Sequence, residues 1–363
     1  MEKGLCELCN PKQWKTVSTS ELTSTGYPVY GANGVIGYYS NYNHYKETLL
    51  ITCRGATCGT LKICKPFSYI NGNAMALDDL SDEIDIKYLY YFLLSRGLSD
   101  TITGSAQPQI VRQSLKNVRV IYPNLDAQKR IIYVLGKADE LLSIRKQQIA
   151  KLDELVKARF VEMFGTFPAN PFRWSTGKIQ DVVSDVRYGS SRPAVEGGKY
   201  PYLRMNNITY SGKLDLHDTK RIDIPDSELD KCTVRRGDVL FNRTNSKELV
   251  GKTCVYNRDE LMVLAGFIIR VRVNERIRPE VLSAFLNMDF SKRMLIGMCK
   301  TAIGQANINA KELQNIDLYI PPIELQDQFV ALKNKIDQQK QTVQQSLEKL
   351  ELLKKALMQE YFG

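Results

Sequence analysis

The chain contains one long segment twice, and this repeat constrains the fold more than any other feature. Residues 107–165 align without a gap on residues 305–363, at a constant offset of 198. Each copy runs from a polar loop through a short apolar strand to a proline, then through about forty residues of helical pattern to Phe-Gly. A gap-free internal repeat predicts two similar structural units with pseudo-twofold symmetry. Matching positions include Gln107/Gln305, Ile110/Ile308, Pro123/Pro321, Gln128/Gln326, Leu152/Leu350 and Phe164/Phe362.

The helical part of each copy carries a hydrophobic seam with coiled-coil spacing. Between residues 125 and 165 apolar residues recur at alternating steps of three and four, and Arg145 and Arg159 fill two of the steps. Between residues 323 and 363 Lys340 and Lys354 interrupt the same spacing. A seam this long favours a helical partner, so we expect an antiparallel pair of helices, although each helix could instead pack only on its own domain. The predicted seam includes Leu135, Leu142, Ile149, Leu152, Val156, Leu347, Leu350 and Leu357.

The remaining segments, 1–124 and 166–322, are predicted to form two small mixed α/β domains. With 363 residues, two domains are expected. Short apolar runs broken by glycine turns indicate strands in both segments. The fold class is therefore α+β, with two mixed domains separated by long helices at 125–165 and 323–363. The expected elements are strands within 26–39, 48–64, 115–123, 188–209, 235–256, 262–273 (a strand pair or one bent strand) and 313–322, and helices at 86–98 and 279–288.

The net charge of +10 is concentrated outside the long helices. The helical segment 126–163 has a net charge of +2 and the segment 324–361 a net charge of zero, so +8 lies in the rest of the chain. Positive potential on globular domains suits a polyanion such as DNA, although a basic protein without a nucleic-acid role stays possible. We expect no membrane segment and no signal peptide, and eight cysteines without framework spacing fit reduced thiols in the cytoplasm.

Motifs that would carry catalysis are incomplete. Gly251-Lys252-Thr253 resembles the end of a phosphate-binding loop, but Ser246 occupies the position of its first glycine. Cys6 and Cys9 have zinc-like spacing without a second pair at a suitable distance. The two histidines of the chain are too few for a histidine-rich metal site. We therefore predict a non-catalytic protein with no catalytic residue, no metal and no cofactor of its own.

Polar loops next to predicted strands are the candidates for DNA contact. Arginine, asparagine and lysine side chains can bind base edges, whereas serine, threonine and lysine hold phosphates. An ordinary solvated loop is the alternative for each residue taken alone. The predicted DNA-binding residues of the first half are Tyr30, Asn33, Arg54, Thr57, Gln107 and Gln109. Those of the second half are Arg192, Arg204, Asn206, Asn207, Arg243, Thr244, Asn245, Ser246, Lys247, Gln305 and Asn307.

Several of these stretches resemble the DNA-specificity subunit of type I restriction-modification systems, and the resemblance covers essentially the whole chain. The motifs that carry it are GYPVYGANGVIGYY with CRGATCG, and YGSSRP, YPYLRMNNIT and RRGDVLFNRTNSKELVGK. The segments YPNLDAQKRI and IPPIELQDQF are similar to the family's Pro-Pro-Leu-x-Glu-Gln entry into a long helix. Gln128 and Gln326 fit that pattern, whereas Ala127 and Leu325 replace its glutamate.

The resemblance implies a role in recognising double-stranded DNA. Each target recognition domain is expected to bind one half of a bipartite, asymmetric site, while the antiparallel helices set the spacer. It also implies that two methyltransferase subunits, which carry S-adenosylmethionine, dock against the chain, and that restriction subunits can join. The alternatives are a specificity module of a related restriction-methyltransferase system and a coiled-coil adaptor that binds no DNA.

Overall fold

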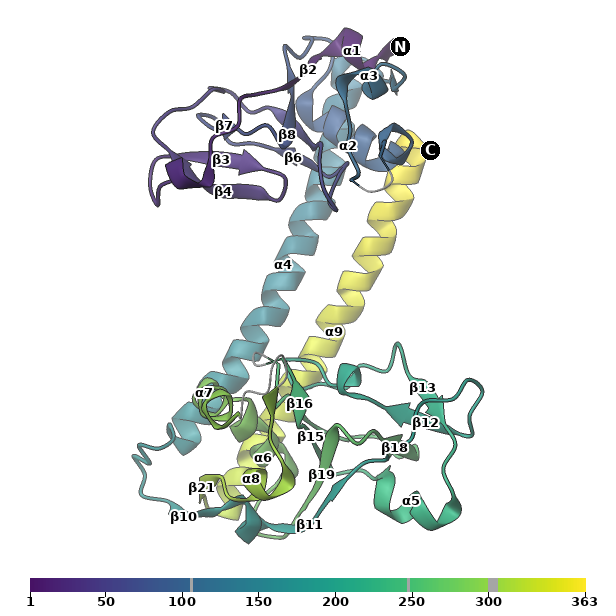
Figure 1. The fold of residues 1–363 in the computed structure, drawn as a ribbon. Coiled ribbons are helices and arrows are strands. Elements are labelled where there is room, and N and C mark those ends of the chain that lie inside the picture. The colour runs from purple at the N-terminus through teal and green to yellow at the C-terminus, as the bar shows by residue number, and fades with distance from the viewer. Residues whose placement is uncertain (105–106, 247–248, 300–305) are drawn as a thin grey trace. The chain divides into compact units, whose positions relative to one another are not determined.

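The computed structural model describes residues 1–104, 107–246, 249–299 and 306–363 (Figure 1). Two predicted DNA contacts, Lys247 and Gln305, lie outside the described residues. The chain forms two compact units. Unit 1 comprises Met1–Lys146 and Gln345–Gly363, and unit 2 comprises Gln147–Gln344. Each unit therefore takes in part of both long helices, so the units do not coincide with the four predicted segments.

Unit 1 is built on short strands in three sheets. The strands are β1 (Glu2–Gly4), β2 (Asn10–Gln13), β3 (Tyr27–Gly31), β4 (Gly34–Tyr39), β5 (Leu49–Thr52), β6 (Leu61–Ile63), β7 (Tyr69–Ile70), β8 (Ala74–Asp78) and β9 (Arg119–Ile121). A four-stranded antiparallel sheet has the order β2-β8-β5-β6. A second sheet has the order β4-β3-β7, in which β3 and β7 are parallel. Strand β1 pairs with β9, which leads into the first long helix.

The core of unit 1 lies under helix α2 (Ile86–Arg96). Its N-cap residue Asp85 accepts a hydrogen bond from the backbone of Lys87 at 2.8 Å, and Gly97, with φ of +72°, ends the helix. Tyr88, Leu89, Phe92 and Leu93 are buried because they share the face that packs on the sheet. The short helices α1 (Leu5–Leu8) and α3 (Arg112–Leu115) complete this unit's core.

Unit 2 repeats this plan with additional elements. Its strands are β10 (Ser175–Lys178), β11 (Val183–Tyr188), β12 (Tyr200–Leu203), β13 (Lys220–Ile222), β14 (Thr233–Val234), β15 (Val239–Asn242), β16 (Thr244–Asn245), β17 (Thr253–Val255), β18 (Met262–Leu264), β19 (Ile268–Val273), β20 (Ala306–Asn307) and β21 (Asp317–Ile320). Its helices are α5 (Asp226–Cys232), α6 (Pro279–Asn287), α7 (Asp289–Met298) and α8 (Ala310–Gln314). The sheet β11-β19-β15-β17 has the same antiparallel connectivity as β2-β8-β5-β6, and β12 pairs with β18 in parallel as β3 does with β7.

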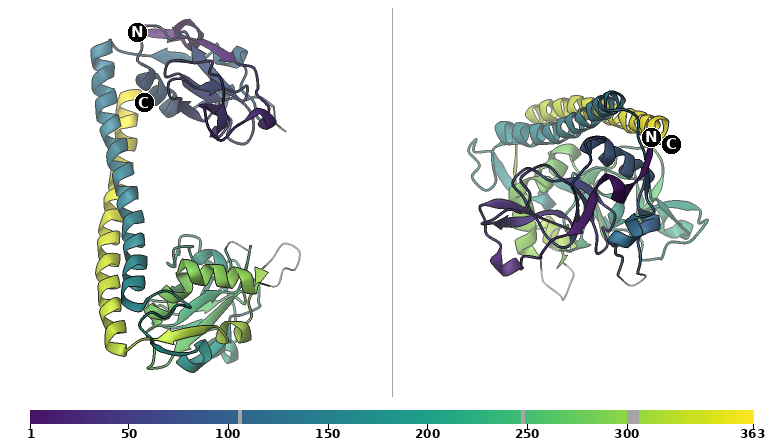
Figure 2. Two further views of the ribbon diagram at one scale, coloured as in Figure 1. Left: turned by 90° about the vertical axis from the view of Figure 1, so that its left-hand side faces the viewer. Right: turned by 90° about the horizontal axis from the view of Figure 1, so that it is seen from above.

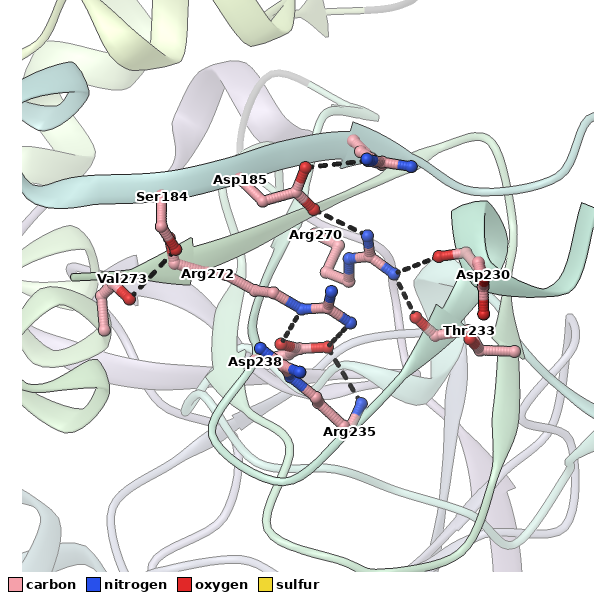
Figure 3. Close-up of polar contacts among 10 residues, drawn as sticks. Ser184, Asp185, Asp230, Thr233, Arg235, Asp238, Arg270, Arg272 and Val273 are labelled. Atoms are coloured by element: carbon pink, nitrogen blue, oxygen red, sulfur yellow. Dashed lines mark hydrogen bonds and ion pairs between the residues drawn. The ribbon is translucent and has the colours of Figure 1, made fainter.

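In unit 2 a buried arginine joins the sheet β11-β19-β15-β17 to the sheet β13-β12-β18-β14 (Figure 3). Arg270 on β19 is 1% exposed and donates hydrogen bonds to the Asp185 carboxylate at 2.8 Å and to the carbonyls of Asp230 and Thr233. Its neighbour Arg272 binds Asp238, whose carboxylate also accepts the backbone N–H of Arg235 at 2.9 Å. Burial opposes ionisation of Asp185, but its arginine partners outweigh this and lower the pKa of the carboxyl group.

The two long helices, α4 (Leu125–Phe164) and α9 (Ile323–Phe362), run antiparallel within each unit (Figure 2). In unit 1 Lys354 of α9 binds Asp139 of α4, and in unit 2 Lys340 binds Asp153. Both lysines interrupt the hydrophobic seam, and in both units the facing helix supplies a carboxylate. The antiparallel pair predicted from the seam is therefore confirmed, and the lysines specify its register.

The helix ends close the cores of the two units. In unit 1 the ring of Phe362, at the end of α9, lies 5.5 Å from that of Tyr88 and 6.0 Å from that of Phe92, centre to centre. In unit 2 Phe164, at the end of α4, packs on Phe329 at 5.4 Å. The Phe-Gly ends of the two repeat copies are therefore packing residues, one in each unit.

Candidate nucleic-acid interface

The predicted DNA-binding loops occupy the same backbone frame in the two units. In unit 1 the backbone of Thr52 exchanges hydrogen bonds with Gly59 and Thr60, and the loop between them projects from the end of β5. In unit 2 Asn242 exchanges the same bonds with Gly251 and Lys252. The backbone N–H of Ile110 binds the Cys53 carbonyl, as that of its repeat partner Ile308 binds Arg243. One scaffold therefore presents two different loop sequences.

This frame places the two arginines differently. Arg243 takes the position of Cys53, whereas Arg54 takes the position of Thr244, one residue further along. The bridge from Arg54 to Gln109 in unit 1 corresponds to the pairing of Thr244 with Asn307 in unit 2. Adjacent residues of an extended chain point to opposite sides, so the two units present their arginines on different sides of the loop.

In unit 1 the loop lies against the turn between β3 and β4. The Thr57 hydroxyl donates to the Asn33 side chain at 3.0 Å, so two predicted residues from separate segments are brought together. Arg54 and Gln109 are exposed and lie on paired backbone. Among the ion pairs of the described residues, none involves the Arg54 guanidinium, so this group is available to an anion or a base edge.

In unit 2 the Arg243 guanidinium lies 4.8 Å from the centre of the Tyr188 ring. The Tyr188 hydroxyl in turn accepts the backbone N–H of Ala310 at 2.8 Å, so the ring that orients the arginine is itself fixed. The Thr244 hydroxyl donates to the Asn307 side-chain oxygen at 3.2 Å. Asn245 and Ser246 are half-buried beside them, and the Asn245 oxygen accepts the Ser246 backbone N–H. These residues form one polar cluster.

Other predicted contacts are engaged within the protein. Arg192 binds Glu228 through two nitrogens at 2.7 and 3.2 Å, and Arg204 binds Asp218 at 2.9 Å. Asn207 is buried, and its amide holds the backbones of Arg204 and Asp215. Asn206 and Gln107 are exposed. Phosphates would have to displace carboxylates from Arg192 and Arg204, whereas Asn207 has a structural role in its loop.

Tyr30 also differs from the expectation of an accessible contact. It is 4% exposed, and its hydroxyl accepts the backbone N–H of Lys65 at 3.3 Å. The ring packs in a small core with Leu50 and Ile70. A direct contact between Tyr30 and DNA would require this side chain to leave the core.

Two buried lysines behind the loop of unit 2 were not among the predicted site residues. The Lys292 amine on α7 donates to the carbonyl of Gly251, at the end of the loop, at 2.6 Å. The Lys252 amine donates to the carbonyl of Met205 at 2.9 Å. Burial, with Lys157 and Lys252 nearby, lowers the pKa of Lys292 to about 7. Both lysines therefore anchor the loop, and Lys292 could not be found from the sequence because it lies on helix α7, which the hydrophobic pattern did not predict.

The predicted docking residues of the long helices fall into two groups, one buried and one half-buried. Leu135 and Leu347 are buried and contribute to the packing inside their units. Leu142, Ile149, Leu152, Val156, Leu350 and Leu357 are half-buried. Leu155 and Leu353, related by the repeat, are 38% and 52% exposed, which leaves apolar surface at equivalent positions of the two helices. These two leucines are more exposed than any of the eight predicted docking residues.

The described residues contain neither a cluster of metal ligands nor a helix suited to cross a membrane. They contain no group of three or more histidine, cysteine, aspartate or glutamate residues arranged to hold a metal ion. No helix within the four described ranges qualifies as a membrane span.

Comparison with known proteins gives one consistent answer. Residues 1–154 and 171–352 match the family described as type I restriction modification DNA specificity domain. The chain is 27% identical over 196 residues to the putative type I restriction enzyme MjaX specificity subunit of Methanocaldococcus jannaschii, which covers 53% of this chain and 46% of that protein. It is 24% identical over 191 residues to the EcoKI specificity subunit of Escherichia coli K12, covering 52% and 41%. These matched segments thus span less than half of each relative.

A longer match and a solved structure extend this similarity. The MjaVIII specificity subunit of M. jannaschii is 23% identical over 340 residues, covering 86% of this chain and 77% of that protein. The crystal structure of the type I restriction-modification S subunit from M. genitalium aligns with a TM-score of 0.62 at 17% identity, covering all of this chain and 96% of that one, and thus shares its fold. Since the family match extends over both halves of the repeat, the chain belongs to the family of type I restriction modification DNA specificity domains.

Proposed function

We propose that the chain is the DNA-recognition subunit of a type I restriction-modification complex and reads a bipartite, asymmetric site. One observation carries the proposal. Two units of the same fold hold their loops in the same backbone frame, yet carry Arg54 and Gln109 in one and Arg243 and Asn307 in the other. A duplicated scaffold with unlike contact residues is what reading two unlike half-sites requires.

The chemistry of the loops supports base recognition. An arginine donates two parallel hydrogen bonds to guanine, and asparagine or glutamine binds adenine in the same bidentate way. Arg54 with Gln109, and Arg243 with Asn307, place one residue of each type in each unit. The basic charge outside the helices supplies attraction to phosphates that does not depend on sequence.

Catalysis belongs to partner subunits in this proposal. Two methyltransferase subunits dock against the long helices, where the repeat provides two equivalent docking surfaces around Leu155 and Leu353. Those subunits bring S-adenosylmethionine and methylate one adenine in each half-site, while this chain contributes no catalytic residue. Restriction subunits, where present, are directed to the same DNA site.

A binding experiment on the reconstituted complex tests the proposal. The chain would be assembled with its methyltransferase subunits and incubated with genomic fragments, and the bound fragments would be sequenced. We expect enrichment of one sequence made of two specified halves separated by an unspecified spacer of fixed length. Enrichment of a single uninterrupted motif, or no sequence preference, would refute the bipartite reading.

A further inference from the structure

One buried glutamine occupies the same position at the start of each long helix. Gln128 on α4 and Gln326 on α9 are related by the repeat, and both are completely inaccessible to solvent. A buried primary amide costs free energy unless its oxygen and both N–H groups are paired. In each unit the amide meets this demand with backbone groups of the recognition domain.

The hydrogen bonds of the two glutamines correspond one to one. The Gln128 nitrogen donates to the carbonyls of Pro123 and Glu83, each at 2.9 Å, and its oxygen accepts the backbone N–H of Asp85 at 2.8 Å. In unit 2 the Gln326 nitrogen donates to the carbonyls of Pro321 at 2.9 Å and Arg276 at 3.0 Å, and its oxygen accepts the backbone N–H of Arg278 at 2.8 Å.

Each amide therefore ties three segments together. Pro123 and Pro321 follow the last strands, β9 and β21, that lead into the long helices. Asp85 and Arg278 are the N-cap residues of α2 and α6, the helices that cover the domain cores. Apolar side chains also pack at these joints, including Ile131 in unit 1 and Phe329 in unit 2. An ion pair joins Arg278 to Asp327 in unit 2, but it is exposed, and exposed ion pairs contribute little. Apolar contacts have little directional preference, whereas three hydrogen bonds to one amide fix both distance and angle.

We infer that Gln128 and Gln326 are positioning residues that fix the angle between each recognition domain and its long helix, and thereby make the complex selective for one spacer length. The inference rests on the proposed function, because only a bipartite site has a spacer to measure. Neither side chain can touch DNA, since both are buried. Their effect is on where the loops are held and not on which bases the loops bind.

The test measures methylation by the assembled complex on duplexes that share both half-sites but differ in spacer length by one base pair. Gln128→Glu and Gln326→Glu keep the shape and the accepting oxygen, but they replace an amide that donates twice by a carboxyl group that donates at most once. We expect the preference for the natural spacer to fall about tenfold in each variant, the effect of losing roughly one net hydrogen bond, with unchanged base preferences. Gln328→Glu, the same substitution at an exposed position of the same helix turn, should leave the spacer preference unchanged.

The outcomes separate the inference from the proposed function. If the unaltered complex methylates no bipartite site, the proposed function fails. If it does, and intact complexes of the glutamate variants keep their spacer preference within about twofold, the inference is overturned, because hydrogen bonds of ordinary net strength would shift it further.

A second pair of variants covers the case in which the glutamate variants do not assemble. Arg278 has a φ of −82°, which proline can adopt, so Arg278→Pro removes the N–H that binds Gln326. Arg278→Ala keeps this N–H but loses the same exposed ion pair to Asp327. We expect only the proline variant to accept altered spacers, and identical spacer profiles for the two variants would overturn the inference.

Discussion

At the residue scale, what a loop side chain can contact depends on its position in the loop and on the residues that pack around it. Arg54 and Arg243 look alike as arginines in polar loops, yet they occupy different positions of a shared frame. Tyr30 and Asn207 looked equally accessible, but tertiary contacts bury both. Arg270 can be buried because the Asp185 carboxylate and two carbonyls from outside its strand accept its hydrogen bonds. Such partners, distant in sequence, cannot be predicted from local pattern.

Substitution of the loop arginines should affect one half-site each. Arg243→Ala removes a bidentate donor and is expected to weaken discrimination in the half-site read by unit 2 by about 1–3 kcal/mol per base pair contacted. Arg54→Ala, its counterpart in unit 1, should do the same in the other half. Binding to libraries randomised in one half at a time measures both effects. An equal loss of preference in both halves from either single substitution would contradict independent reading.

Lys292 should make the stability of unit 2 depend on pH. Its pKa is lowered from 10.5 to about 7, so the unfolded state binds more protons between these values. The free energy of unfolding is therefore expected to rise as pH increases from about 7 to about 10, and this part of the rise should disappear in Lys292→Met. Denaturant titrations at several pH values measure it. Lys335→Met, at an exposed lysine, serves as control and should match the unaltered protein. The same slope in all three proteins would contradict the assignment.

At the element scale, the sequence predicted the long helices well because a seam repeated over many turns is a strong signal. It also predicted α2 and α6, whose apolar faces are clear. Helix α7 escaped prediction because its polar residues Ser291 and Lys292 point inward and no side chain caps its start. Residues 262–273, left open between a strand pair and one bent strand, form two strands that belong to different sheets. Their separation depends on partners elsewhere in the chain.

Lys340, a buried lysine of the helix pair, is expected to fix the register of the two helices but to lower the free energy of unfolding. Lys340 is 3% exposed and pairs with Asp153, which is 40% exposed and can be rehydrated. Lys340→Leu replaces the buried charge by an apolar side chain at a seam position. We expect this substitution to raise the free energy of unfolding of unit 2 by about 1 kcal/mol. Thermal and denaturant unfolding measure the change. Lys335→Leu, at an exposed position, should change it by less than about 0.5 kcal/mol. A destabilised Lys340→Leu variant would show that the pair is net stabilising.

At the scale of the whole molecule, the constant offset of the repeat predicted two equivalent frames, and the matching hydrogen bonds of Gln128 and Gln326 confirm that equivalence in atomic detail. The boundary between the compact units could not be predicted, because the seam continues through residues 146 and 147 without a change in pattern. The identity of the bases that each loop reads also depends on geometry with DNA, which the sequence does not encode in any simple pattern.

The charge of the whole chain predicts strong salt dependence of DNA binding. Most of the net charge of +10 lies outside the long helices. If the complex neutralises about six phosphates, its affinity should fall about a thousandfold between about 50 and 200 mM salt. Fluorescence anisotropy with a labelled duplex measures the dependence. A change of less than about threefold would indicate that phosphates contribute little to binding.

The central claim is that this chain directs a methyltransferase complex to its DNA sequence, and that each unit recognises one half-site. Single-molecule sequencing of methylated adenines, in the source genome with and without the gene for this chain, tests it most directly. The account predicts one bipartite, asymmetric motif, methylated on one adenine in each half, that disappears entirely when the gene is deleted. Methylation that persists unchanged in the deletion strain, or a lost motif without two separated halves, would contradict it.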